Sequence, residues 1–331
     1  MTFSPDRRRI VGLASLATAG LLPALAGCAN PLPLAAVPPA ADDAAAARWL
    51  RESAEHHGLS RYLALNDINV AYAGQWRPLI DRIQPEVVDK SWRASSEERL
   101  LPRQDPGFIA QAHRGPAGRK HVVRQRGRGA GDMGRVAVWY EGRADEREGI
   151  RTASALVADC YQLFLLGPLW LAPRVRGLAG ASSGGPAGAS AAGSPAGEAR
   201  LALGDRLEVD GRECQWVQAW LAPGFGLVAG DRVDLAIDVQ DRTTRRMRFT
   251  LEGYAGTRGA VAETDTFEHE RVGGVLWPMR SFERVVRPLA GLPVHDWRIT
   301  GLDLDRGYGL EAVQGPAFEG AAAAPARPRA G

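Results

Sequence analysis

The stretch that most constrains this chain is residues 152–171, an almost continuous run of apolar side chains. At 3.6 residues per turn, its polar members Thr152, Asp159 and Gln162 fall on one narrow stripe of a helix, and the rest of the circumference is apolar. Such a helix has to be covered by other elements on nearly all sides. Gly167 and Pro168 end it short of the ~20 residues that a bilayer crossing needs. We therefore expect a core helix, or a helix that lines an apolar cavity.

The N-terminus has the pattern of an export signal. Arginines at positions 7–9 precede an apolar segment over 10–25, and Leu25-Ala26-Gly27-Cys28 follows. This resembles a bacterial lipoprotein signal, in which small residues fit the peptidase and the cysteine thiol takes a diacylglycerol. We predict that residues 1–27 are removed and that Cys28 is lipidated; an ordinary signal peptide or membrane anchor is the alternative. Ala29, where retained lipoproteins carry Asp, favours the outer over the inner membrane.

Composition limits the partners of the mature chain. The net charge is +3, and because the leader carries three arginines and one aspartate, the mature chain has about +1. No basic stripe with interleaved aromatics is present, so nucleic acid is not an expected partner. Two cysteines remain after Cys28. In an oxidising compartment Cys160 and Cys214 can form a disulfide or stay as two buried thiols.

The rest of the chain reads as one domain between two unstructured segments. Residues 28–43 are rich in Pro and Ala and form a tether. Asp42 or Asp43 caps a helix over 44–57. We expect a single domain over 44–314, with a flexible Gly/Ala/Ser/Pro loop at 177–199, and a disordered tail at 315–331.

Alternating apolar and polar residues predict a mostly antiparallel sheet. The best case is a hairpin in which Val233, Leu235 and Ile237 face the same side as Met247 and Phe249. A short helix is expected between Leu79 and Val87, and a turn at Asp210-Gly211. Further strands are expected over 68–72, 95–101, 108–113, 120–124, 135–140, 207–209, 213–221, 260–269, 275–286 and 294–304. The prediction is an α+β fold whose sheet has one apolar, buried face and one polar, solvent-exposed face.

Few residues point to catalysis or to a metal. There is no nucleophile elbow and no zinc-protease motif, and the glycine-rich run 127–131 reads as a loop before a strand, not as a phosphate loop. The acidic segment 303–307 reads as a turn because it lacks the later glutamate of a calcium loop. The histidines are scattered. We expect no enzyme, no cofactor and no metal site.

The order of elements resembles the LolA/LolB-like lipoprotein-sorting and lipid-carrier proteins. The closest local match is the strand–turn–strand segment 237–247, Ile-Asp-Val-Gln-Asp-Arg-Thr-Thr-Arg-Arg-Met, with Thr244 where that family often has Gly. The gating arginine of that family has no identifiable counterpart. The resemblance covers about 44–304 and implies an open, strongly curved half-barrel wrapped around a central apolar helix, with an N-terminal helix. It further implies that acyl chains are sheltered inside.

These observations lead to a functional hypothesis with one main alternative, and an unrecognised hydrolase ranks after both. The chain is expected to be a membrane-anchored envelope lipoprotein, facing the periplasm, that binds a lipid or another acylated ligand without catalysis. The expected lining is Leu163, Phe164, Leu166, Trp170, Trp216, Trp220, Val233, Leu235, Ile237, Met247 and Phe249. The alternative is an interaction or scaffold lipoprotein with a filled core, which holds an envelope protein partner on the arginine-rich outer face of its sheet. Each of these residues can equally be ordinary core.

Overall fold

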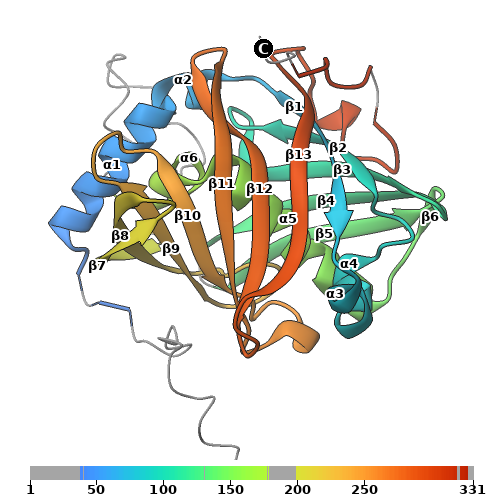
Figure 1. The fold of residues 1–331 in the computed structure, drawn as a ribbon. Coiled ribbons are helices and arrows are strands. Elements are labelled where there is room, and N and C mark those ends of the chain that lie inside the picture. Colours follow the sequence, from blue (N-terminus) through green and yellow to red (C-terminus); the bar gives the residue numbers. More distant parts are fainter. Residues whose placement is uncertain are drawn as a thin grey trace, which may run out of the picture. The chain divides into compact units, whose positions relative to one another are not determined.

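One large antiparallel sheet organises the part of the chain that the structure describes. The computed structural model describes residues 38–39, 41–129, 131–176, 178, 199–318 and 321–326, and the unit Pro33–Gly331 is compact. Within those residues 13 strands form a single sheet in the order β6-β5-β4-β3-β2-β1-β13-β12-β11-β10-β9-β8-β7 (Figure 1). The terminal strands β6 and β7 do not pair with each other, so the described sheet is open. The predicted large antiparallel sheet is confirmed.

The sheet consists of two meanders joined by the pairing of β1 with β13. The first meander comprises β1 (Ile68–Trp76), β2 (Ser95–Leu101), β3 (Asp105–Gly115), β4 (Gly118–Gly129), β5 (Asp132–Tyr140) and β6 (Arg143–Ala144). The second comprises β7 (Ala199–Val209), β8 (Arg212–Leu221), β9 (Asp231–Asp238), β10 (Thr244–Thr250), β11 (Val261–Val272), β12 (Val275–Arg287) and β13 (Leu292–Leu304). Strands far apart in sequence therefore close the middle of the sheet.

The helices lie at the ends of this sheet and against one of its faces. They are α1 (Ala44–His57), α2 (Leu59–Ala64), α3 (Pro78–Ile83), α4 (Pro85–Val88), α5 (Glu148–Leu166) and α6 (Pro168–Leu171), with 3-10 turns η1 (Ala172–Arg174), η2 (Ala255–Thr257) and η3 (Leu310–Ala312). The predicted first helix is confirmed. Asp43 caps it by accepting hydrogen bonds from the amides of Ala45 and Ala46, and Gly58, with φ +96°, ends it.

The apolar run is helix α5, and every residue from Ala153 to Leu166 is buried. It packs on β3, β4 and β5 of the first meander and on β12 of the second, and its Phe164 ring lies 5.4 Å from the ring of Phe249 in β10. Helix α5 therefore contacts strands of both meanders. No single helix of the described residues is long and apolar enough to cross a bilayer, and α5 and the segment after Gly167 meet at 113°.

The β9–β10 hairpin has the predicted phase, but its outer face is not wet. Leu235 pairs with Met247 and Val233 with Phe249 on the inner side. On the outer side every residue of β9 is also buried. The reason is that arginines there pair with acids of neighbouring strands: Arg248 with Glu263 at 2.6 Å, for example. The charged side chains of this face are therefore shielded by their ion-pair partners, where the prediction had them shielded by water.

Two other expectations change. The short helix predicted between Leu79 and Val87 is two helices, α3 and α4, because Pro85 starts a new one. The glycine-rich segment expected as a loop is partly strand, since β4 runs to Gly129, which pairs with Asp132. Position 130 and most of the expected loop 177–199 lie outside the described residues.

The prediction of a disordered tail is also wrong for the part of the tail that the structure describes, residues 315–318 and 321–326. A bulge in the β1–β13 pairing leaves Thr300 without a partner in β1, and the Thr300 carbonyl accepts a hydrogen bond from the amide of Ala326. The amide of Leu302 donates to the carbonyl of Ala324. A Cβ on Gly301 would come within 2.8 Å of that same oxygen, so glycine permits the close approach. Backbone hydrogen bonds, which composition does not reveal, hold this segment.

Candidate functional site

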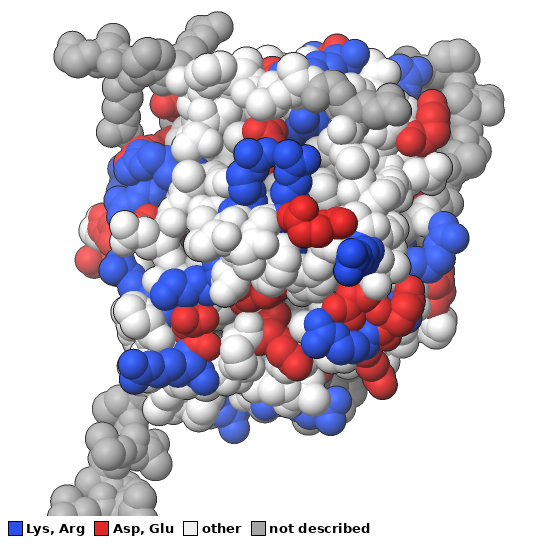
Figure 2. Space-filling model, turned by 90° about the vertical axis from the view of Figure 1, so that its right-hand side faces the viewer, with Lys and Arg blue, Asp and Glu red and all other residues white. Residues whose placement is uncertain are grey.

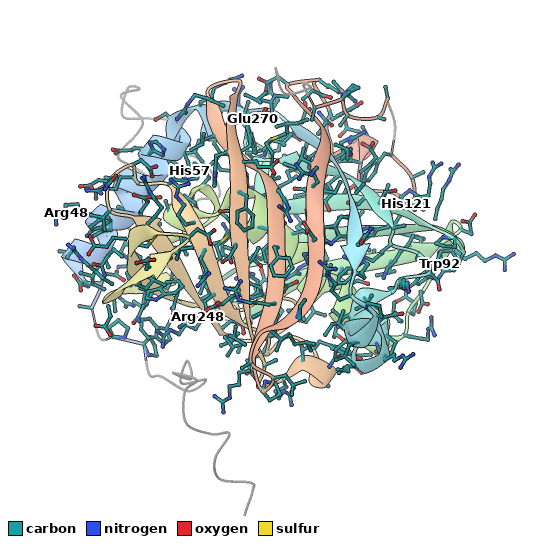
Figure 3. All side chains as sticks on the ribbon, in the orientation of Figure 1. Arg48, His57, Trp92, His121, Arg248 and Glu270 are labelled. Atoms are coloured by element: carbon teal, nitrogen blue, oxygen red, sulfur yellow. The ribbon has the colours of Figure 1, made fainter. Side chains whose placement is uncertain are left out.

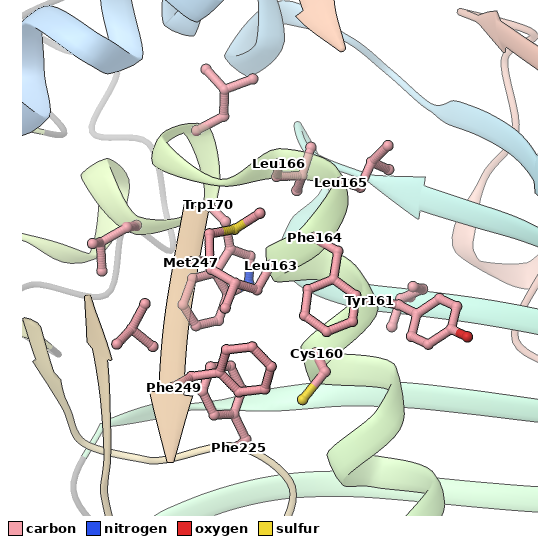
Figure 4. Close-up of a cluster of buried hydrophobic side chains, with 14 of the residues drawn as sticks. Cys160, Tyr161, Leu163, Phe164, Leu165, Leu166, Trp170, Phe225, Met247 and Phe249 are labelled. Carbon is pink, nitrogen blue, oxygen red and sulfur yellow. The ribbon is translucent and has the colours of Figure 1, made fainter. Parts of the chain in front are cut away.

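The residues predicted to line a cavity fall into two groups on opposite faces of the sheet. Most of them share one large hydrophobic cluster around α5: Leu163, Phe164, Leu166, Trp170, Val233, Leu235, Ile237, Met247 and Phe249 (Figure 4). Trp216 belongs to a separate small cluster with Cys214. Trp216 and Trp220, both expected in the lining, lie on the outer face, because Trp216 pairs with Ala236 and Trp220 with Arg232.

The two outer tryptophans serve as platforms for arginines. The guanidinium of Arg248 lies 4.7 Å from the ring centre of Trp216, and that of Arg232 lies 4.9 Å from Trp220. Cation–π contacts of this kind suit a sheet face where arginines are packed between acids. Neither tryptophan borders the space next to α5.

The inner cluster is densely packed where the sequence placed the cavity. The ring of Trp170 stacks on Phe225 at 5.7 Å, and Phe164 contacts Phe249. The gap among Leu166, Met247 and neighbouring side chains measures about 10 Å³. Pockets that take organic ligands measure roughly 300–1,000 Å³. This part of the interior is filled core in the structure.

A larger apolar cavity, about 50 Å³, lies farther toward the start of α5, beneath α3 and α4. Its lining includes Trp76, Ile80, Val87, Val88, Leu156, Val157, Cys160, Tyr161, Phe164, Leu251, Val285 and Val294. Only Phe164 was among the predicted lining residues. The apolar pattern of residues 79–88 was the available signal, but its short helices could not be placed over α5 from sequence.

Helices α3 and α4 form the cover of this cavity. The cover turns apolar side chains both toward the cavity and toward solvent. Ile80 points in and is buried, whereas Leu79 and Ile83 on the same short helix are 50% and 45% exposed. Ile80 and Val88 belong to a small cluster with Val285 and Val294 that is separate from the main core. The cover therefore makes part of its apolar contacts in this small cluster, while Val87 packs against the main one.

A buried arginine, missed in the sequence, fastens the cover. Arg93 is 2% exposed, and its Nη1 donates a 2.6 Å hydrogen bond to the carbonyl of Val87 in α4. Its guanidinium lies 4.9 Å from the ring centre of Trp76 and 5.4 Å from that of Tyr161. A cation at the carbonyl end of a helix is favourable. Arg93 therefore connects α4 to two aromatic side chains that line the cavity.

Buried polar groups lie near the cavity. Burial raises the pKa of Glu98 to about 7, even though Gln111 donates a 2.7 Å hydrogen bond to it. Glu283 and His295, which both line the cavity, are 2.8 Å apart. Among the described residues no group of three or more His, Cys, Asp and Glu side chains is placed to hold a metal ion.

The two cysteines of the domain are free thiols in the structure, so the disulfide considered for them is not formed. Cys160 lies in the inner cluster and Cys214 in the outer one, with the sheet between them. Burial raises the pKa of both thiols, that of Cys214 to about 11. Both thiols are therefore protonated at neutral pH. Cys28 and the predicted signal and tether up to residue 37 lie outside the described residues.

Comparison with known proteins finds similar structures but no similar sequences. Neither a family model nor a curated protein matches the chain. A DUF1329 family protein from Desulfovibrio piger matches at a TM-score of 0.49 and 11% identity, over 81% of this chain and 95% of that one. A LolA superfamily protein from Nitrosomonas europaea matches at 0.45 and 11%, over 84% and 98%. An outer membrane lipoprotein-sorting protein domain from Vibrio parahaemolyticus matches at 0.45 and 8%, over 81% and 95%.

One of these structures bears the LolA superfamily name and another the lipoprotein-sorting name, the two names that the sequence resemblance suggested. TM-scores below 0.5 mark a partial likeness, and they say nothing about the ligand or partners of this chain. These have to be argued from its own residues.

Proposed function

We propose that this chain is a lipid-anchored protein of the bacterial cell envelope that binds a hydrophobic or acylated ligand between its sheet and α5, without catalysis. The anchor is a diacylglycerol on Cys28, and the domain faces the periplasm, at the outer rather than the inner membrane. The ligand enters beneath α3 and α4. The observation that carries this proposal is the apolar cavity under these two helices.

The cover over this cavity is suited to move. Helices α3 and α4 have six and four residues, and helices this short have little stability of their own. They are held by Arg93 and by contacts with the loop around η2, where the hydroxyl of Tyr254 donates to Glu86 at 2.5 Å. Releasing these polar contacts, together with the small apolar cluster of Ile80 and Val88, frees the cover while the strands of the sheet stay paired. The cavity, which measures about 50 Å³ with the cover in place, would then widen toward the roughly 300 Å³ at which pockets take organic ligands.

Uptake of a neutral, environment-sensitive dye such as N-phenyl-1-naphthylamine tests this proposal. We expect the folded wild type to bind the dye and palmitate to displace it. Val285→Phe fills the cavity from β12, so it should weaken dye binding at least tenfold with little loss of stability, because the ring replaces missing contacts. Val286→Phe is the matched control, because Val286 is the extra residue of a bulge next to Val285 and is not among the residues that line the cavity. A folded wild type that takes up no dye would contradict the proposal.

A specific observation favours the second candidate, a scaffold lipoprotein. The interior around Phe164 and Phe249 is packed, as a filled core requires. The arginines of the outer face, however, already pair with Glu263 and Asp265 of their own sheet, which leaves them little charge for an envelope protein partner. In a scaffold, Val285→Phe overpacks a closed core and costs about 1–3 kcal/mol. The same pair of variants therefore separates the two candidates.

A further inference from the structure

A second hollow lies on the outer face of the first meander, across the sheet from α5. It measures about 530 Å³. Its floor is formed by the small side chains of Ala71, Ala73 and Ala112, which alternate with the inward-facing residues of β1 and β3. Phe318 and Ala322 of the C-terminal segment form one wall. A space of this size matches the pockets that take small organic molecules, roughly 300–1,000 Å³.

The charges at one end of this hollow are unbalanced. Arg114 of β3 and Arg119 of β4 are direct cross-strand partners, and both are exposed. Neither side chain has an ion-pair partner among the described residues. Like charges directly opposite each other destabilise a sheet. On the outer face of β10–β12, by contrast, Arg246, Arg248 and Arg284 each meet an acid.

The nearby acids are engaged elsewhere. Glu97, which pairs across the strands with Ala112 of the floor, contacts Arg99 at 3.2 Å and accepts a hydrogen bond from the amide of Ala323 at 3.1 Å. Glu141 accepts a hydrogen bond from the backbone amide of Arg119, not from its guanidinium. The two guanidinium groups are therefore open to an anion from outside the chain.

A buried histidine also favours an anion in this hollow. His121 lies two residues after Arg119 on the same strand face, lines the hollow, and is 7% exposed. Its ring meets Phe318 edge-on at 5.9 Å, and its Nδ1 has no hydrogen-bond partner among the described residues. A buried polar atom without a partner costs free energy. A ligand that hydrogen-bonds to Nδ1 removes that cost.

We propose that this hollow binds a phosphate group, with Arg114 and Arg119 on its oxygens, a hydrogen bond from His121, and the rest of the molecule on the alanine floor against Phe318. Guanidinium forks match phosphate oxygens in geometry and charge. The phosphate comes either from a soluble phosphomonoester or from the headgroup of a membrane phospholipid. The site lies across the sheet from the apolar cavity and does not depend on it. Figure 3 places His121 on the right, and Figure 2 faces that side, where acidic and basic side chains are interspersed and no broad basic patch competes.

Two binding measurements on the Cys28→Ala chain, which lacks the thiol predicted to be acylated, distinguish these sources. The first is calorimetric titration with glycerol 3-phosphate, and the second is co-sedimentation with phosphatidylglycerol vesicles. The test variant is Arg114→Gln with Arg119→Gln. The control is Arg103→Gln with Arg143→Gln, two exposed arginines outside the hollow that give the same charge change.

The wild type is expected to bind in at least one measurement, with at least tenfold weaker binding in the Arg114/Arg119 variant and less than a twofold change in the control. Binding of glycerol 3-phosphate identifies a soluble ligand, and binding of vesicles alone identifies a headgroup. His121→Phe should also weaken binding while keeping the ring contact. Without phosphate, the Arg114/Arg119 variant should unfold at the same or a higher temperature than the wild type, because repulsion is relieved. No binding in either measurement, or equal losses in variant and control, would overturn the proposal.

Discussion

Asp159 of α5 and Arg124 of β4 form a two-pronged ion pair inside the protein, with Nε–Oδ1 and Nη2–Oδ2 distances of 3.1 and 3.0 Å and both side chains fully buried. The amide of Gly226 donates a further hydrogen bond to Asp159 at 2.7 Å, and Arg124 donates to the carbonyl of Gly226. Asp159, one member of the polar stripe, therefore attaches α5 to β4 and to the loop before β9.

Removing this carboxylate should be costly. Asp159→Ala leaves Arg124 buried without its counter-charge, and we expect a loss of about 3–5 kcal/mol in the free energy of unfolding. Urea denaturation measures it. The control is Glu213→Ala, which breaks a pair with Arg206 in which both side chains are 56% exposed and should cost less than about 1 kcal/mol. Similar small losses in both variants would mean that the pair does not hold α5.

Local patterns in the sequence predicted much of the sheet, and long-range pairing was not predictable. Alternation gave the phase of the β9–β10 hairpin because side chains in a strand alternate with a strict period of two. No local pattern indicates that β1 pairs with β13, more than 200 residues later, or that Arg124 reaches Asp159. The outer face was expected to be wet because its residues are charged. Pairing between strands, not composition, decided that those of β9 are buried and those of β10 half-buried.

The two faces of the hairpin should respond differently to substitution. Leu235 is fully buried on the inner side, and Leu235→Asp should cost several kcal/mol because the carboxylate has no partner there. Arg248→Gln, on the outer side, loses the contacts with Glu263 and Trp216 and should cost about 1–2 kcal/mol. Thermal and urea unfolding of both variants measure the difference. Equal costs would show that the two faces are equally sensitive to polarity.

The stability of the protein should depend on pH through Glu98. Its pKa rises from 4.5 to about 7, mainly through burial, so the folded state holds this proton more tightly than the unfolded chain. The stability that this proton contributes is complete below about pH 4.5 and is lost as the pH rises through about 7.

Glu98→Gln keeps an acceptor for Gln111 and cannot ionise. Relative to wild type, the variant should gain stability between about pH 4.5 and pH 8, by an amount on the order of 3 kcal/mol. Glu55→Gln, an exposed position on α1, is the control and should show no such trend. A stability difference that stays constant over this range would contradict the raised pKa.

The membrane anchor can be tested by acyl labelling. Cys28→Ala removes the thiol that takes the diacylglycerol, so the exported protein should carry no label and should appear uncleaved or soluble. Cys160→Ala is a suitable control, because that thiol is buried in the core and should not affect labelling. Normal labelling of the Cys28→Ala protein would remove the lipoprotein interpretation.

The sequence indicated the kind of site better than its position. It identified α5 as the helix that an apolar space would adjoin, and Phe164 does line the cavity. It missed Val285, Val87 and Arg93, since these meet only after α4 folds over β12 and β13. It also assigned Trp216 to the inner face, because alternation gives two faces without telling which one is inside.

The most direct test of the central claim is the mass of the gently purified protein under native conditions. If a hydrophobic chain lies between the sheet and α5, wild type should carry a non-covalent lipid mass that disappears on denaturation. Val286→Phe should retain this mass and Val285→Phe should lose it. A wild type whose native mass equals that of the polypeptide with its covalent anchor would contradict the claim.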